Sequence, residues 1–375
     1  MSAEDTVVEN RTVEELVAGF RPSPELERCL ADLERRVDPA VEDRLRADYV
    51  KFLDGAWPEP IFTPRRPPGA APGCVWPDIR VNAAIGDFNR MALQQFGACS
   101  RLLKEGDGAP LAVRANYGVG ISSAWFGCPV QLMPEEINTL PTSVPLDDRA
   151  RMDALAERGV PDVTAGYSAR VFAMGHIFRS LLAGYPRLRR YVCVYHPDIQ
   201  SPIDTAELVW GSDILLAFYE EPERAHRLLD VLTETYIVAV RRWSAIHPFA
   251  ADGIHAHWNF MHKGNIALRT DSGMNLSPDM YAEFIQPYEQ RCLDACGGGI
   301  NHFCGRGDHF IALMTQARGL HGIAMSQPHL NDMETIFRHT VDRGIPLLGF
   351  SFDAARAARA AGRDLRGLVL VHAKA

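Results

Sequence analysis

The sequence predicts a (β/α)8 barrel of the TIM type, preceded by a helical arm. From about residue 76 onward, short apolar runs alternate with longer helical patterns. This alternation is typical of parallel strands that are joined by helical crossovers. Roughly eight repeats over about 300 residues favour a closed barrel over an open sheet. A chain of 375 residues, 47% of them hydrophobic, can bury the large core that such a barrel needs.

The first 75 residues differ from the rest and are expected to form the arm. Ser23-Pro24 predicts a helix start, because serine caps helices and proline fits the first helical position. A charged amphipathic pattern follows through Leu53. Residues 64–73 are rich in proline and predict an extended linker. We expect the arm to pack either on the barrel, residues 76–375, or on a second subunit.

The alternation defines the expected elements of the barrel. The predicted strands are Leu111–Ala115, Tyr191–Tyr195, Gly253–His257, Ile266–Arg269, Ile300–Phe303, Gly322–Met325, Pro346–Phe350 and Leu368–Val371. The predicted helices are Asp87–Leu103, Arg170–Leu182, Pro222–Ile246, Pro278–Cys296, Asp308–Ala317, Asn331–Asp342 and Asp353–Ala361. Residues 129–165 fit the alternation poorly and are expected to form an insertion near the barrel mouth.

Composition excludes several classes of protein. A net charge of -8 leaves no basic surface for nucleic acid. No apolar stretch of about 18 residues is present, so no membrane span is expected. The N-terminus, Met1–Asp5, is acidic and lacks the apolar core of a secretion signal. The eight cysteines show no framework spacing, which favours a reduced, cytoplasmic chain.

Most of the predicted strands end on polar residues. These residues are Arg114 and Asn116, His196 and Asp198, His255 and His257, Asp271, His302 and Cys304, Gln327 and His329, Ser351 and Asp353, and His372. In a barrel the carboxyl ends of the strands surround one mouth, where the active site lies. Core packing does not require polar residues there, so the pattern predicts an enzyme.

His302 and Cys304 are candidate metal ligands. They stand two residues apart, so on a strand both side chains point to the same face. An imidazole and a thiol that converge on one point suit zinc, which prefers nitrogen and sulfur ligands. The alternative is a buried cysteine beside a hydrogen-bonded histidine.

Three segments resemble the uroporphyrinogen decarboxylase superfamily. They are Glu221–Leu229, Asn275–Tyr288 with its Leu-Ser-Pro…Glu-Phe…Pro-Tyr block, and His302–Gly305. Their order and spacing agree with the superfamily, and the resemblance covers about residues 185–375. It implies a TIM-like barrel with a deep mouth.

The superfamily contains cofactor-free decarboxylases and zinc-dependent methyltransferases that pass methyl groups between corrinoid proteins and thiols. The Arg-rich segment with which true uroporphyrinogen decarboxylases grip their substrate is not found, so a porphyrin substrate is not expected. The His-x-Cys-Gly segment resembles the methyltransferase branch, in which a second cysteine follows at the last strand. Here His372 stands at that place. Because histidine also binds zinc, the resemblance implies a site of His302, Cys304 and His372 with one open position, typical of catalytic zinc.

Other polar residues are candidates for catalysis. Asp271 is expected to act as a general acid or base, or to cap its loop. Arg114 is expected to clamp an anionic substrate or to form an inter-strand ion pair. His257, beside His255 on one strand face and followed by His262, is a further catalytic or metal-binding candidate.

The remaining candidates would bind substrate. Asn116 and Tyr117 follow Arg114 in the chain. Asp198, Gln200 and Asp204 occupy a proline-rich loop that lines the mouth in the superfamily, although such a loop also needs turn-forming residues. Gln327 follows the strand that ends at Met325.

Three hypotheses remain open. The first is a zinc-dependent methyltransferase that acts on a thiol or a corrinoid-bound methyl group. The second is a metal-free decarboxylase or lyase of a small carboxylic acid. The third is a non-catalytic protein that binds a small molecule or corrinoid. The family resemblance also implies a homodimer, and any corrinoid would have to arrive on a separate protein.

Overall fold

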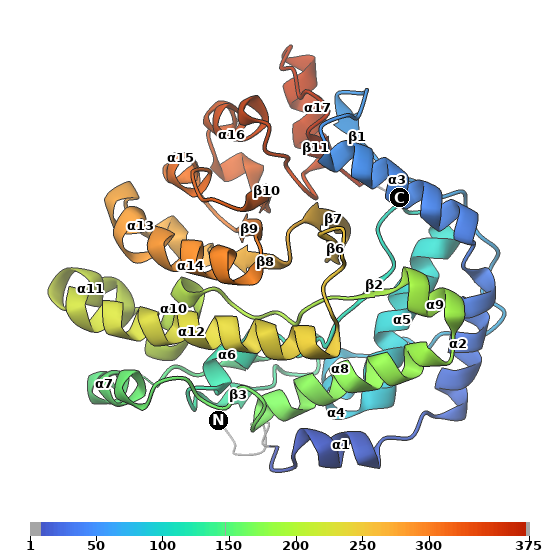
Figure 1. The fold of residues 1–375 in the computed structure, drawn as a ribbon, viewed down its shortest axis with the longest axis horizontal. Coiled ribbons are helices and arrows are strands. Elements are labelled where there is room, and N and C mark those ends of the chain that lie inside the picture. Colours follow the sequence, from blue (N-terminus) through green and yellow to red (C-terminus); the bar gives the residue numbers. More distant parts are fainter. Residues whose placement is uncertain (1–8, 147, 373–375) are drawn as a thin grey trace.

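The computed structural model describes residues 9–146 and 148–372 and shows a mixed α/β protein (Figure 1). Residues 1–5, on which the expectation of no secretion signal rests, lie outside the described residues. The strands are β1 (Ile61–Phe62), β2 (Ala112–Val113), β3 (Val130–Gln131), β4 (Thr142–Ser143), β5 (Cys193–Val194), β6 (Ile254–His257), β7 (Phe260–Lys263), β8 (Ile266–Arg269), β9 (Gly299–Phe303), β10 (Leu320–Met325) and β11 (Val369–Leu370).

Helices surround these strands. They are α1 (Val13–Gly19), α2 (Pro24–Arg36), α3 (Pro39–Leu53), α4 (Val81–Gly86), α5 (Phe88–Glu105), α6 (Gly120–Ala124), α7 (Arg149–Arg158), α8 (Tyr167–Ala183), α9 (Pro186–Tyr191), α10 (Pro202–Trp210), α11 (Asp213–Glu220), α12 (Pro222–Ile246), α13 (Pro278–Phe284), α14 (Gln286–Cys296), α15 (Ile311–Met314), α16 (Met333–His339) and α17 (Phe352–Ala360), with short 3-10 turns η2 (Asp271–Asn275), η3 (Pro328–Leu330) and η4 (Val341–Arg343). Within the described ranges, none of the helices has the length and apolar content needed to cross a membrane.

Parallel pairing dominates the central strands. β8, β9 and β10 form one parallel sheet, and Leu347 bridges β10 at Ile323 to β11 at Val369. β11 in turn pairs in parallel with β1, and β2 pairs in parallel with β5. No parallel ladder joins β1 to β2 or β5 to β8 in residues 9–146 and 148–372. The parallel strands are therefore confirmed, while closure into a barrel stays a prediction.

The two faces of the central sheet carry different sets of apolar residues, as the two-residue period of a strand requires. One face points toward the surrounding helices and includes Leu268, Phe303 and Ile323. The other packs Ala267 and Ile300 among aromatic side chains. Those aromatic residues are Tyr49 and Phe52 of α3 and Phe62 of β1. Helix α3 thus covers the face on which alternate residues of β8 and β9 lie.

The N-terminal helices pack on the rest of the chain, with α1 against α8, α2 against α5 and α3 against α9 and β7 (Figure 1). Helix α2 begins as expected, because the Ser23 side chain accepts a hydrogen bond from the Leu26 backbone at 3.1 Å. A buried ion pair anchors α3, since both carboxylate oxygens of Glu42 accept bonds of 2.6 Å from Arg66. Contact with a second subunit stays untested.

Most of the expected elements are observed, but two predicted barrel strands differ. The strand predicted at Gly253–His257 is β6, which pairs antiparallel with β7 instead of joining the parallel strands. The strand predicted at Pro346–Phe350 is reduced to isolated bridges at Leu347.

The helix predicted over residues 278–296 is divided into α13 and α14, because Pro287 near the start of α14 has no N–H to donate. The segment 129–165 forms the antiparallel β3–β4 hairpin and α7. β7 was missed because Phe260–Lys263 carries little apolar alternation, and β1 because Ile61–Phe62 stands among the prolines at positions 58, 60 and 64.

Candidate metal centre

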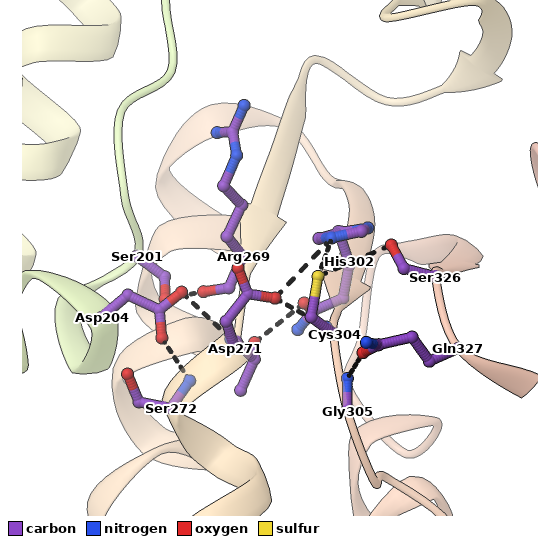
Figure 2. A network of polar contacts seen from close by, with 12 residues as sticks. Ser201, Asp204, Arg269, Asp271, Ser272, His302, Cys304, Gly305, Ser326 and Gln327 are labelled. Carbon is purple, nitrogen blue, oxygen red and sulfur yellow. Dashed lines mark hydrogen bonds and ion pairs between the residues drawn. The ribbon is translucent and has the colours of Figure 1, made fainter. Parts of the chain in front are cut away.

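Three side chains converge at the carboxyl ends of β8 and β9. Asp271 follows β8, His302 is on β9 and Cys304 follows β9. The Nε2 atom of His302 lies 3.4 Å from the Sγ of Cys304 and 3.6 Å from the Oδ1 of Asp271 (Figure 2). One ligand atom from each residue lies within 4.8 Å of the other two, so the three could bind one metal ion.

Strand register brings these residues together. β8 and β9 are parallel neighbours, and Arg269 is the register partner of His302. Both strands therefore end at the same edge, and Asp271 emerges beside His302. The backbone N–H of Cys304 donates a 2.6 Å hydrogen bond to the Oδ1 of Asp271, which ties the two loops to each other. His302 and Cys304 share a face because they stand two residues apart, as the sequence predicts.

The spacing of the donor atoms fits a tetrahedral zinc ion. Bonds of about 2.1 Å to nitrogen and 2.3 Å to sulfur, at a tetrahedral angle, place those two donors about 3.6 Å apart. The same construction gives about 3.4 Å between nitrogen and a carboxylate oxygen. The observed separations are 3.4 Å and 3.6 Å respectively. Imidazole, thiolate and carboxylate together are a typical zinc ligand set.

Burial sets the protonation of the imidazole and the thiol. Desolvation lowers the pKa of His302, so a neutral ring with a free lone pair is favoured. The backbone of Ala324, the register partner of His302 on β10, opposes this lowering. Burial raises the pKa of Cys304, although the Ser326 hydroxyl 3.5 Å from its Sγ opposes this effect. The sulfur is therefore a thiol until a cation replaces its proton.

A buried carboxyl group holds the Asp271 loop. Asp204 at the start of α10 accepts hydrogen bonds from the backbone N–H groups of Asp271, at 3.0 Å, and Ser272, at 2.8 Å (Figure 2). Burial, and then the charge of Asp271, raise the pKa of Asp204 to about 8. The sequence placed Asp204 with Asp198 and Gln200 in a loop expected to line the mouth, and the structure shows that its contacts are with the Asp271 loop.

The structure places His372 away from the other two expected zinc ligands. Its Nδ1 lies 3.4 Å from the Oδ1 of Asp107, and it does not belong to the group of Asp271, His302 and Cys304. Asp271 takes the third place because β8 lies directly beside β9, whereas β11 is separated from β9 by β10 and Leu347. Gln327 lies close to the centre, where its side-chain oxygen accepts a hydrogen bond from the Gly305 backbone.

Arg114, Asp198 and Gln200 are brought together in one group of polar contacts. The Nη1 of Arg114 lies 2.5 Å from the Oδ2 of Asp198, which matches the ion-pair alternative for Arg114. The Gln200 side chain donates to the backbone oxygen of Asp198 at 3.1 Å. Asp198 also pairs with Arg269, a residue that the sequence interpretation missed. A single arginine in the apolar run Ile266–Arg269 was the available signal.

The other predicted residues lie in neighbouring regions. Asn116 has a buried side-chain oxygen without a hydrogen-bond partner and lines a cavity of about 550 Å³ beside Trp76. Tyr117 is buried, and its backbone oxygen accepts a bond from Tyr167. Among the contacts of the described residues, none joins Asn116 or Tyr117 to the three candidate ligands.

His257 is buried in a second group of histidines. Its ring centroid lies 4.5 Å from that of His196 and 6.2 Å from that of His262. Together with His255 these rings line a cavity of about 800 Å³. Burial holds the pKa of His257 well below its usual value, so the ring is neutral. In residues 9–146 and 148–372 the histidines do not form a further group with metal-binding spacing.

Comparison with known proteins supplies a likeness of fold. No family model matches the sequence, and no curated protein matches it. Among solved structures the chain is similar to a methyltransferase from Methanosarcina mazei, with a TM-score of 0.58 and 15% sequence identity. The match covers 87% of this chain and 92% of the other. The two proteins therefore share a fold over most of their length. Their sequence identity is too low to assign the activity of one protein to the other.

Proposed function

We propose that this protein is a zinc-dependent methyltransferase of the uroporphyrinogen decarboxylase superfamily, which acts on a thiol or a corrinoid-bound methyl group. The observation that carries the proposal is the convergence of Asp271, His302 and Cys304 at separations that fit zinc. The fold likeness to a methyltransferase and the His-x-Cys-Gly segment support the same conclusion.

We also infer that the strands follow the (β/α)8 plan. Eight parallel segments occur in chain order, counting β1, β2, β5, β8, β9, β10, the segment at Leu347 and β11. Neighbours in this order pair with each other except at two junctions, and β11 pairs with β1. At the junction of β5 and β8, side chains bond the strand backbone instead. The Nε2 of His196 accepts from Ala267 N at 3.2 Å, and Ser201 donates to the backbone oxygen of Arg269.

In this proposal Asp271, His302 and Cys304 hold the zinc ion, and a fourth position is open to substrate. Bound zinc would stabilise a substrate thiol as its thiolate at neutral pH, which makes the sulfur a nucleophile. Asp271 is placed here as the third ligand, in the position that the family resemblance gives to His372. Asp204 and the backbone N–H of Cys304 would fix the direction of the Asp271 carboxylate.

The methyl group would move from its donor to the substrate sulfur in one displacement. A sulfur–carbon bond forms as the bond from the methyl carbon to its carrier breaks, and the carrier keeps that electron pair. The thiol proton leaves to solvent when the sulfur binds. Asp271 is partly exposed at this edge, so solvent reaches the ligand group.

Turnover with purified, zinc-loaded protein tests the proposal. The protein is mixed with a small thiol and a methylated corrinoid, and the thioether product is measured by mass spectrometry. We expect product with the wild type and with Cys74→Ala, because Cys74 lies beside Cys29 and far from this centre in the chain. We expect none with Cys304→Ala. Equal turnover in Cys304→Ala would overturn the proposal.

A further inference from the structure

Two arginines share one carboxylate beside the candidate metal centre. Asp198 is paired through its Oδ2 with Arg114 at 2.5 Å and through its Oδ1 with Arg269. Arg269 also donates to the backbone oxygen of Ile199 at 2.9 Å. The side chains of Asp198 and Arg269 are 7% and 6% exposed, whereas that of Arg114 is 17% exposed. Asp198 and Arg269 are therefore nearly inaccessible to solvent, and Arg114 is the most accessible of the three side chains.

This group carries an excess positive charge. Two guanidinium ions face one carboxylate, and arginine stays protonated at any physiological pH. The neighbouring imidazole of His196 adds no negative charge, and burial lowers its pKa to about 4. The carboxyl group of Asp204, whose pKa is raised to about 8, is bonded to the Asp271 loop, and Figure 2 shows the Arg269 side chain extending away from it. A buried charge without a partner is costly, so an anion would stabilise this arrangement.

The arginine pair lies next to the candidate zinc ligands. Arg269 and His302 are register partners on adjacent strands. Trp258, at the turn between β6 and β7, links them. The Arg269 guanidinium lies 4.9 Å from the centre of the Trp258 ring, and the His302 ring contacts the same indole edge-on with 5.1 Å between centroids. One aromatic side chain therefore contacts both the arginine group and the metal ligand group.

The backbone of Trp258 is unusual for its residue type. Its φ of 49° lies in the left-handed region, where a bulky side chain is a rare outlier. Glycine or asparagine would be the ordinary choice at this position of a two-residue hairpin turn. Strain of this kind persists where the surrounding structure enforces it, and it is concentrated at functional sites. Here it holds the indole between Arg269 and His302.

We propose that Arg114 and Arg269 form an anion-binding subsite for the carboxylate of the substrate, with Trp258 as the wall between that subsite and the zinc ion. The planar guanidinium fork matches a carboxylate in geometry and charge. This inference rests on the proposed function and names its substrate class: a small thiol, or its methylated form, that carries a carboxylate. Asp198 is then a positioning residue that holds both arginines in place.

A series of thiols tests the subsite directly. The protein is loaded with cobalt(II), whose thiolate complexes absorb visible light, and titrated with mercapto acids of increasing chain length and with the neutral 2-mercaptoethanol. We expect the best mercapto acid to bind about tenfold to a hundredfold more tightly than the neutral thiol, the range for a charge-assisted contact. The cationic thiol cysteamine is expected to bind most weakly.

Variants separate the subsite from the metal. Arg114→Gln should remove the preference for mercapto acids while leaving cobalt content and the affinity for 2-mercaptoethanol unchanged. Arg224→Gln is the matched control, because Arg224 is also paired with a carboxylate, that of Asp153, at 2.9 and 3.0 Å. It should keep the preference of the wild type.

The outcomes are distinguishable. Equal affinity for acidic and neutral thiols in the cobalt-loaded wild type, or an unchanged preference in Arg114→Gln, would overturn the subsite and leave the metal centre standing. Failure of any thiol to give the cobalt–thiolate absorption would overturn the proposed function. In that event a calorimetric titration of the metal-free wild type and Arg114→Gln with 3-mercaptopropionate decides the subsite, because only the wild type should bind.

Discussion

Glu289 is expected to make the stability of this protein depend on pH. It is fully buried on α14, behind the ends of β8 and β9, and desolvation raises its pKa from 4.5 to about 7. Thr270, directly after β8, and Asn301, on β9, bond to it, Asn301 at 2.9 Å, and the Tyr281 hydroxyl donates at 3.1 Å. Thr270 and Asn301 directly precede Asp271 and His302 in the chain, so this network supports two of the candidate ligands.

The hydrogen-bond network, like burial, favours a protonated Glu289 in the folded state. The Thr270 hydroxyl oxygen lies within bonding distance of both Glu289 and the Asn301 side-chain oxygen, which is 2.8 Å away. One hydroxyl hydrogen cannot serve two acceptors. A proton on Glu289 resolves the conflict, because the carboxyl group then donates to Thr270 and Thr270 donates to Asn301. The neutral form of Glu289 is therefore the one that the folded state favours.

The size of the pH effect on stability follows from the pKa of Glu289 in the unfolded chain, 4.5, and in the folded protein, about 7. A carboxyl group whose pKa is raised by folding stabilises the native state at low pH, and this stabilisation is lost as the pH rises from 4.5 to 7. Each unit corresponds to 1.36 kcal/mol, so the difference of about 2.5 units amounts to about 3 kcal/mol. Glu289→Gln replaces the acidic hydrogen with an amide donor that does not titrate. Its free energy of unfolding should therefore fall less than that of the wild type over this range.

Urea denaturation at several pH values between 4.5 and 7.5 measures this difference. We expect the stability of Glu289→Gln relative to the wild type to increase by about 3 kcal/mol across the range. Glu25→Gln is the control, because Glu25 is exposed on α2 and should show no such trend. Parallel pH profiles of the wild type and Glu289→Gln would refute the reasoning.

Three further predictions concern the strands, the arm and the metal ligands. Gly299→Ala should lower the free energy of unfolding by about 3 kcal/mol in thermal melts, because a Cβ there would collide with the backbone oxygen of Ile266 on β8; wild-type stability would contradict the β8–β9 register. Glu42→Gln should cost about 3 kcal/mol, since it leaves the buried Arg66 guanidinium without its carboxylate, and a loss below about 1 kcal/mol would show that this pair does not anchor α3. Asp271→Asn should weaken zinc affinity about tenfold or more in a chelator competition assay, whereas unchanged affinity would exclude Asp271 as a ligand.

The central strands could be predicted from the sequence because their apolar runs are distinct. Ile266–Arg269 was predicted with the bounds that the structure shows, and helix Pro222–Ile246 likewise. The interruption between α13 and α14 could have been read from Pro287, whose effect on helices is local. Which strands are neighbours depends on contacts between residues far apart in the chain, and local patterns do not contain this information.

In the candidate site, too, the sequence predicts local spacing but not which distant residues meet. The pairing of His302 with Cys304 follows from a two-residue spacing and is found in the structure. The order of the strands in the sheet decides which residue is the third candidate ligand. Asp271 lies beside His302 because β8 is the neighbour of β9, while His372 lies beside Asp107. Arg269 was missed because its importance comes from partners on other elements.

Metal content tests the central claim most directly. Purified protein without an affinity tag is reconstituted with zinc, passed through a desalting column and measured by plasma mass spectrometry beside Cys304→Ala and Cys74→Ala. The proposal predicts about one zinc ion per chain in the wild type and in Cys74→Ala, and none in Cys304→Ala. Zinc-free wild type, or equal zinc in Cys304→Ala, would contradict a metal centre of Asp271, His302 and Cys304.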